Sequence, residues 1–239
     1  MYEFKTDPYE HQRQAWKESW RKEYYALFME MGTGKSKVAI DTIAALFEAG
    51  EIDTALILAP KGVYDNWIQG EIPTHLPDRI KHKILRWQPN VSKKFLQELK
   101  DFAIPKFREP ETFSSGKGAE TAMDFLKLNP KSIMIVDEST TIKNRQAQRT
   151  KNIIKCGRLC RYRRILTGSP ITKSPMDLFS QCDFLAEKCL GFNSFFAYQS
   201  RYAVIQKRTM GARSFNEVVG YRRLDELTEK LEPISTRVL

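Results

Sequence analysis

Cysteine and histidine are scarce in this chain of 239 residues, and they do not provide the two close pairs that structural zinc sites usually combine. The four cysteines are Cys156, Cys160, Cys182 and Cys189; they form no Cys-x-x-Cys pair, and the three histidines lie far from them in the sequence. Structural zinc sites usually draw on such close pairs. A four-cysteine zinc site is therefore the weaker interpretation, and reduced, half-buried thiols on helices are the stronger one.

Long hydrophobic runs are also missing. The longest, such as residues 55–59 (ALILA), are far too short to cross a bilayer. The N-terminal MYEFKTDPYE has no basic start followed by an apolar stretch, so we expect no signal peptide, no membrane partner and a cytoplasmic location. Hydrophobic residues still make up 41% of the chain, which is enough to bury the core of one large domain or two small ones.

Acidic residues are absent from one long segment, Thr141–Lys173. It holds ten Lys or Arg residues, which equals the net charge of +10 of the whole chain. Two interpretations stay open for such a run. It is either a solvated helix face or a track for a polyanion, most often a nucleic acid.

Short apolar runs alternate with helical patterns along the chain. Each run is followed closely by Gly, Pro or Asp, as in buried strands, and helices with start or stop signals lie between the runs. The predicted strands are Tyr24–Met29, Thr54–Ala59, Ser132–Val136 and Arg164–Thr167, and the predicted helices are Tyr9–Lys22, Gly34–Ala49, Ala147–Leu159 and Pro175–Ala186. This alternation predicts an α/β fold, with a mostly parallel sheet and helices on both faces.

Three local patterns add detail to this prediction. Asp7 is expected to cap the first helix, with Pro8 in its first turn. Phe107–Glu120 is rich in Ser, Gly, Glu and Pro and predicts a long surface loop. Lys207–Arg222 is compatible with a hairpin around Gly211, and the sequence shows no internal repeat.

The segment Gly32-Thr33-Gly34-Lys35-Ser36 lies between a predicted strand and a predicted helix. Glycines let the backbone turn so tightly that several N–H groups can face phosphate oxygens, and the helix N-terminus adds its positive dipole end. Lys35 is then expected to reach the β- and γ-phosphates of ATP, and Ser36 to bind Mg²⁺. Met29 departs from the full pattern, which has a small residue at this place.

A second run, Ser132–Glu138 (SIMIVDE), is an apolar strand that delivers two carboxylates at its carboxyl end. That edge of a parallel sheet is where ligands bind. Asp137 is expected to hold Mg²⁺ through water, and Glu138 to orient or deprotonate the attacking water. Alone, the pair would be an ordinary solvated turn; together with Lys35 it predicts a site that hydrolyses a nucleotide.

Two other uses of a phosphate cradle find no support. The sequence shows no pattern for the acceptor pocket and mobile lid of a small-molecule kinase, and it lacks the Asn-Lys-x-Asp with which switch GTPases read guanine. ATP used as fuel is the remaining interpretation.

Five segments, taken in order, resemble the Q motif and motifs I, Ia, II and III of superfamily-two helicases, most closely the Swi/Snf-type DNA translocases. The segments are Gln12 after Pro8-Tyr9, Glu30–Ser36, Ala59-Pro60 with Trp67, Asp137–Thr140 and Leu166–Pro170, and Lys143-Asn144 fill the Lys-Asn place shortly after motif II. The resemblance covers about residues 7–186. It implies a RecA-like P-loop lobe over residues 1–186, with residues 187–239 as an extension of the same lobe.

The resemblance also implies roles for single residues. Gln12 would read the adenine edge, and Met31 joins the phosphate loop among the ATP-binding residues. Thr167 and Ser169 would couple the nucleotide state to the nucleic-acid face. The residues expected near a DNA strand or in this coupling are Lys61, Asn66, Trp67, Lys143 and Asn144. Each has an ordinary alternative, and for Trp67 core packing is slightly favoured over proximity to DNA.

Three departures from the family pattern stand out. Ser139-Thr140 replace the common Ala-His of motif II, Met29 stands where the Swi/Snf type often has Asp, and no clear motif Ib precedes motif II. The loop Glu109–Phe113 is a candidate for the place of motif Ib.

The resemblance finally implies an ATP-driven motor acting on nucleic acid, with duplex DNA favoured, and a second RecA-like lobe in the same chain or in trans. No pattern after Ala186 matches such a lobe, so slow hydrolysis is expected of these residues alone. The alternatives are an ATP-gated nucleic-acid binding module and a P-loop ATPase that remodels protein. The plain motor suggests a prokaryotic or virus-infected cell as its location.

Overall fold

The computed structural model describes residues 2–86, 106–108, 116–210 and 213–239. Its centre is a parallel sheet of seven strands in the order β3-β4-β2-β5-β6-β1-β9. The strands are β1 (Tyr24–Met29), β2 (Thr54–Leu58), β3 (Leu85–Arg86), β4 (Lys106–Arg108), β5 (Ser132–Asp137), β6 (Tyr162–Thr167) and β9 (Ser235–Val238). The predicted α/β fold with a parallel sheet is confirmed.

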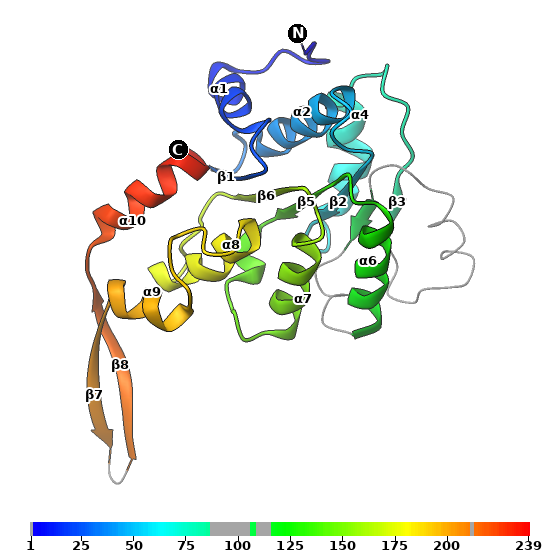
Figure 1. Cartoon of the computed structure of the whole chain (residues 1–239). Coiled ribbons are helices and arrows are strands. Elements are labelled where there is room, and N and C mark those ends of the chain that lie inside the picture. Colours follow the sequence, from blue (N-terminus) through cyan, green and yellow to red (C-terminus); the bar gives the residue numbers. More distant parts are fainter. Residues whose placement is uncertain (1, 87–105, 109–115, 211–212) are drawn as a thin grey trace.

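Helices cover both faces of the sheet, as Figure 1 shows. On one face lie α1 (Glu10–Ser19), α2 (Lys35–Glu48) and a helical segment made of α3 (Tyr64–Asn66), the π-helical turn η1 (Trp67–Glu71) and α4 (Ile72–His75). On the other lie α6 (Gly116–Leu128), α7 (Gln148–Gly157), α8 (Leu178–Leu185) and α9 (Phe195–Tyr202). The remaining helical elements are α10 (Leu224–Leu231) and the short 3-10 turns η3 (Ser139–Ile142), η4 (Pro175–Asp177) and η5 (Glu232–Ile234).

Alternate side chains of the central strands pack into two separate cores, one on each face of the sheet. In β1, Tyr25 and Leu27 pack under α1 and α2, whereas Ala26 and Phe28 face the side of α6, α7 and α8. This division follows from the period of two in a strand, which sends neighbouring side chains to opposite faces. Because both faces are covered, the central strands are apolar throughout, which is why short continuous runs identified them.

Several boundaries differ from the sequence predictions. The first helix begins after Tyr9 rather than at an Asp7 cap, because the backbone N–H of Tyr9 donates to Gln12 Oε1 over 3.0 Å. The loop predicted over Phe107–Glu120 is wrong at both ends, where β4 ends and α6 begins. The rest of that loop, including Glu109–Phe113, lies outside the described residues.

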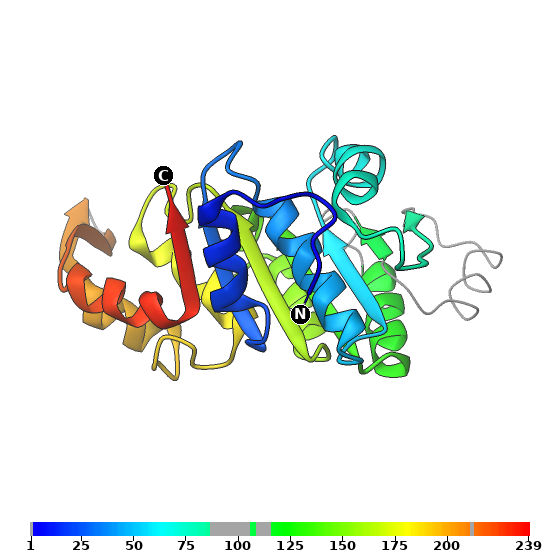
Figure 2. The same cartoon turned by 90° about the horizontal axis from the view of Figure 1, so that it is seen from above.

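The C-terminal residues return to the central sheet. Strand β9 pairs in parallel with β1, and Val238 O accepts a hydrogen bond from the N–H of Glu30, which directly follows β1, over 3.1 Å. Figure 2 shows β9 beside the N-terminal helix, with its end at the same edge as the ends of the other strands. The edge strand β9 therefore lies beside β1 in the sheet, although paired residues of the two strands are more than two hundred positions apart in the sequence.

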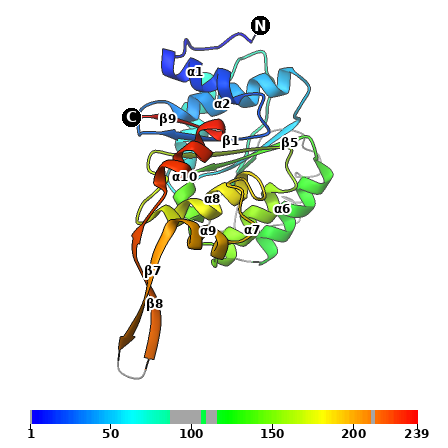
Figure 3. The same ribbon diagram turned by 60° about the vertical axis from the view of Figure 1, so that its left-hand side comes forward.

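The predicted hairpin is confirmed as a long antiparallel ribbon of β7 (Ala203–Met210) and β8 (Arg213–Tyr221), and its turn at residues 211–212 lies outside the described residues. It extends away from the sheet and its helices in Figure 1 and Figure 3. In the part of the chain that the structure describes, no helix combines the length and apolar character that crossing a bilayer requires.

Candidate nucleotide-binding site

The phosphate loop joins β1 to α2, as predicted. Gly32 and Gly34 have φ angles of 80° and 81°, in the left-handed region that only glycine enters at little cost. A Cβ added to Gly34 would stand 2.3 Å from Gln12 Nε2, so another residue would have to displace the Gln12 amide as well as strain the backbone. Lys35 and Ser36 then open α2, which places both at a helix N-terminus, where anions bind.

Gln12 holds this loop in place. Its Nε2 donates to Thr33 O over 3.0 Å, while its Oε1 accepts from Tyr9 N, and His11 Nε2 also lies 2.9 Å from Thr33 O. Because a trans peptide points its C=O and the next N–H in opposite directions, the Gly34 N–H is turned away from Gln12. The bond to Thr33 O uses one of the two amide hydrogens of Gln12, and the other is not used in these contacts. The predicted contact of Gln12 with adenine stays a prediction.

Three predicted catalytic groups converge beside this loop. Lys35 Nζ lies 4.0 Å from Glu138 Oε1, and Lys35 is only 9% exposed. Asp137, at the end of β5, is buried, and its Oδ1 accepts from the backbone N–H of Glu138 over 2.9 Å. The two carboxylates thus come from adjacent residues of one strand end, as the sequence predicted, and the lysine comes from the neighbouring loop.

Trp67 is the unexpected member of the site. Its side chain is 0% exposed, and its indole N–H donates to Asp137 Oδ2 over 2.9 Å. This burial agrees with core packing, the interpretation that the sequence favours for Trp67, and it leaves no exposed ring surface to lie against DNA. The π-helical turn that begins at Trp67 instead links the motif Ia segment to the buried carboxylate.

The carboxylates are held in an environment that resists ionisation. Burial raises the pKa of Asp137, against the N–H donors of Trp67 and Glu138, which lower it. Burial also raises the pKa of Glu138; the charge of Asp137 adds to this increase, and Lys35 and the Thr167 hydroxyl oppose it. Groups with such shifts gather at functional sites, because a buried cleft with paired charges produces them.

Motif III meets the other motifs at this point. Glu138 adopts a left-handed backbone conformation with φ 48°, which is uncommon and costly for a residue other than glycine. The hydroxyl of Thr167 lies near enough to the Glu138 side chain to lower the pKa of that carboxyl, and it accepts a hydrogen bond from Ser169 N over 3.3 Å. A Cβ at Gly168 would come within 3.3 Å of Glu30 Cα. The end of β6 therefore lies close to both Glu138 and the start of the phosphate loop.

Sequence reasoning missed a buried link between motif II and motif III. Ser139 Oγ donates to Gln181 Oε1 over 2.7 Å, and Gln181 Nε2 donates to Pro170 O over 2.7 Å. Ser139 occupies the place where the family commonly has Ala, so here a hydroxyl joins the loops after β5 and β6 through α8. A buried Ser and a Gln 42 positions apart give no signal in the sequence.

The other predicted nucleic-acid and coupling residues lie at the surface or near it. Lys61, Asn66, Asn144 and Ser169 are exposed, and Met31, in the phosphate loop, is 86% exposed. Lys143 is half-buried, with its Nζ donating to Thr172 Oγ1. Their contacts with a nucleic acid stay predictions.

The basic segment Thr141–Lys173 is not one continuous track. Arg164, in β6, is 0% exposed, and its guanidinium donates to backbone carbonyls at and just after the end of α1, including Ser19 O and Lys22 O over 2.8 and 2.7 Å. Arg158 and Arg161 form ion pairs with Asp183 and Glu51. The segment includes a central strand and crosses the fold, so its ten charges separate in space.

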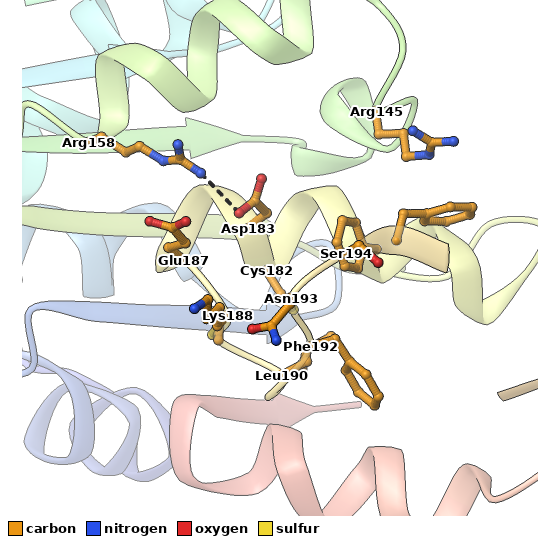
Figure 4. Close-up of a pocket in the computed structure, with 13 residues that line it drawn as sticks. Arg145, Arg158, Cys182, Asp183, Glu187, Lys188, Leu190, Phe192, Asn193 and Ser194 are labelled. Carbon is orange, nitrogen blue, oxygen red and sulfur yellow. Dashed lines mark hydrogen bonds and ion pairs between the residues drawn. The ribbon is translucent and has the colours of Figure 1, made fainter. Parts of the chain in front are cut away.

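A cavity of about 310 Å³ lies away from the phosphate loop, between α7, α8 and the start of α9. Figure 4 shows Arg158 reaching toward Asp183 on one side and Arg145 on the other. Charges of both signs line it, since Lys188 and Glu187 contribute as well. Because positive and negative side chains are mixed in its lining, this cavity does not favour an anionic nucleotide, in contrast to the phosphate loop.

The donor set fits Mg²⁺ better than a metal held by protein alone. Among the described residues, no group of three or more His, Cys, Asp or Glu could hold a metal ion, and the four cysteines are free thiols. Ser36 and Asp137 carry oxygen atoms of the kind that would suit Mg²⁺, which typically takes one or two such groups together with substrate phosphates.

Comparisons with known proteins agree with this geometry. The profile described as SNF2-related domain matches residues 22–232. The chain is 31% identical over 162 residues to the chromatin-remodeling ATPase INO80 of Saccharomyces cerevisiae, which covers 65% of this chain and 10% of that protein. It is 27% identical over 216 residues to the DNA annealing helicase and endonuclease ZRANB3 of Mus musculus, covering 88% of this chain and 18% of that protein.

A solved structure shows the same fold. The Sulfolobus solfataricus SWI2/SNF2 ATPase core in complex with dsDNA aligns with a TM-score of 0.74 at 21% identity, over 99% of this chain and 45% of that one. The site and fold define a RecA-like P-loop lobe. The chain belongs to the SNF2-related family, and it spans about a tenth to a fifth of the curated relatives described above.

Proposed function

We propose that this chain is the ATP-binding motor lobe of a DNA-dependent ATPase, a helicase or a translocase on duplex DNA. The observation that carries the proposal is the convergence of Lys35, Asp137 and Glu138 on a glycine loop at the carboxyl edge of a parallel sheet. The similar proteins, named as an ATPase, a helicase and an ATPase core in complex with dsDNA, support the same function.

The residues divide the chemistry between them. Backbone N–H groups of the loop and Lys35 hold the phosphates, and Ser36 and Asp137 would hold Mg²⁺, which neutralises charge on the phosphates when it is bound. Glu138 orients the attacking water and accepts its proton, for which a raised pKa is suited. Thr167, whose hydroxyl acts on the pKa of Glu138, would report the state of this site to the end of β6.

We further propose that residues 187–239 extend the same lobe and that a second RecA-like lobe, in the same chain or in trans, completes the site. Strand β9 supports the first point, because it adds to the sheet that carries the phosphate loop. An arginine supplied opposite the γ-phosphate can be worth a factor of about 10³ to 10⁵ in rate. The 239 residues alone should therefore hydrolyse ATP slowly, with little stimulation by DNA.

The sequence-based location, the cytoplasm of a prokaryotic or virus-infected cell, stays a prediction. Two alternative functions also remain: ATP-gated nucleic-acid binding without movement, and remodelling of protein. Strong DNA stimulation of ATP turnover in a two-lobe form would favour the motor. ATP-dependent DNA affinity without such turnover would favour the gated module, and ATP use indifferent to DNA would favour a protein target.

The cradle is tested by titrating a fluorescent ATP analogue with Mg²⁺ against Lys35→Ala. This variant should bind at least tenfold more weakly, because a charge-assisted contact to phosphate contributes about 1.5–3 kcal/mol. The control is Lys17→Ala, which removes an exposed lysine of α1 and should bind like the parent chain. Equal affinity of the parent and Lys35→Ala would contradict the assignment of the loop.

A further inference from the structure

The β7–β8 ribbon and the residues at its root carry an excess of positive charge. Residues 201–223 include six Lys or Arg residues and a single acidic residue, Glu217, which amounts to half of the net charge of +10. Lys207, Arg208 and Arg213 lie on the two strands, Arg222 and Arg223 lie at their root, and Arg201, in α9, pairs with Glu226. None of the charged side chains that the structure describes in this stretch is buried.

The ribbon has no cover from the rest of the described chain along most of its length. Figure 1 and Figure 3 show it extending beyond α9 and α10. Ile205 and Val218 form a cross-strand pair near its root and are 41% and 36% exposed, and Phe215 is 48% exposed. A register shift between Val204 and Ile205 marks a bulge, which increases the twist of a ribbon.

Little of the positive charge is neutralised within the ribbon. Arg208 Nε donates to Glu217 Oε2 over 2.7 Å, which occupies the one acidic side chain. On the opposite face, Lys207 lies across from Asn216, so its cross-strand partner is neutral. At the root, Arg222 donates to the carbonyl oxygens of Ser200 and Arg201, which are neutral groups and leave its charge in place.

A twisted two-stranded ribbon with exposed cations matches a duplex in shape and charge. The major groove of B-DNA admits such a ribbon, and Lys and Arg at its sides neutralise phosphates whatever the base sequence. We propose that the β7–β8 ribbon is a contact for duplex nucleic acid, separate from the edge of the sheet that carries the nucleotide site. This inference rests on the proposed DNA-dependent function and names a surface for it.

Two substitutions test the ribbon in the 239-residue chain. One removes a positive charge, and the other removes a negative charge. Lys207→Gln should weaken binding of a fluorescein-labelled mixed-sequence duplex about tenfold at low salt, and should reduce the slope of log K against log salt by about 0.9, the value for one phosphate contact. Glu217→Gln should strengthen binding, because it frees Arg208 and adds one net positive charge. A purely structural role of the ribbon would not produce a gain from the second change.

Controls separate the ribbon from the proposed function. Lys155→Gln, on the exposed side of α7 within the basic segment, should bind the duplex like the parent chain. All three variants should keep the ATP-analogue affinity and the thermal midpoint of the parent.

If the parent binds the duplex and both ribbon variants match it, or if Lys155→Gln loses as much as Lys207→Gln, the ribbon assignment is overturned and the proposed function is not. Absence of duplex binding by the parent would overturn both. Poly-glutamate that displaces the duplex at equal charge concentration would overturn the preference for nucleic acid and indicate an acidic protein partner.

Discussion

Replacing Trp67 with phenylalanine isolates a single hydrogen bond to the buried carboxylate of the site. The ring remains, but the indole N–H that donates to Asp137 Oδ2 over 2.9 Å is lost. A hydrogen bond to a charged group contributes about 1.5–3 kcal/mol, and the smaller ring adds a packing loss. We therefore expect the free energy of unfolding at neutral pH to fall by about 2–4 kcal/mol, which for a chain of this length lowers Tm by roughly 4–16 °C.

The pH dependence distinguishes the hydrogen bond from the packing loss. Burial already raises the pKa of Asp137, and the Trp67 N–H lowers it by favouring the charged form. Without this donor the pKa rises further. The part of the loss due to the hydrogen bond should be complete at pH values above the raised pKa and should shrink as the pH falls through it. The packing part should not change with pH.

Trp16→Phe is the matched control. The indole nitrogen of Trp16 is also buried, but it has no hydrogen-bond partner in the described part of the chain. Denaturant unfolding of both variants at neutral and acidic pH measures the difference. Equal, pH-independent losses for Trp16→Phe and Trp67→Phe would refute the reasoning. Binding of Mg²⁺ with ATP should also weaken in Trp67→Phe alone, because Asp137 would hold a proton more tightly.

Three further substitutions have defined outcomes. Gly34→Ala should abolish ATP-analogue binding in titrations, because its Cβ would meet Gln12 Nε2 at 2.3 Å and its φ is positive; retained binding would contradict this account of the loop. Asp41→Ala should lower the free energy of unfolding by about 3–5 kcal/mol in urea titrations, because it strands the buried charge of Lys37, now 2.9 Å away, and adding Lys37→Met should restore part of the loss. Arg164→Met should cost about 3 kcal/mol or more in the same assay, because several buried carbonyl groups lose their donor; a loss below about 1 kcal/mol would show that water satisfies them.

The nucleotide site could be predicted because its parts obey local rules. A glycine loop between a strand and a helix, and two carboxylates at the end of an apolar strand, need only the geometry of a parallel sheet to come together. The structure brings Lys35 within 4.0 Å of Glu138 on these grounds. The four predicted strands agree with the observed ones to within two residues at either end.

The interactions that escaped prediction join residues far apart in the sequence. Arg164 counts as a surface charge in the composition, yet it reaches the carbonyl group of Ser19 across 145 positions. The bond from Trp67 to Asp137 spans 70 positions. Strand β9 was missed because STRV is half-buried at the sheet edge and lacks the continuous apolar run of the central strands. Such contacts depend on tertiary packing, which no local pattern encodes.

The hydrogen bond between Val238 and Glu30 connects the end of strand β9 to the start of the phosphate loop, so that a force on one would act on the other. Four parallel pairs join β9 to β1, and the ladder ends one residue before the loop that surrounds the phosphates. A force applied along β9 would load this ladder in shear, so that its hydrogen bonds resist together instead of opening one at a time. Tension at the C-terminal end would thus reach the backbone of the phosphate loop directly, and a change of shape in that loop would in turn displace the C-terminal end.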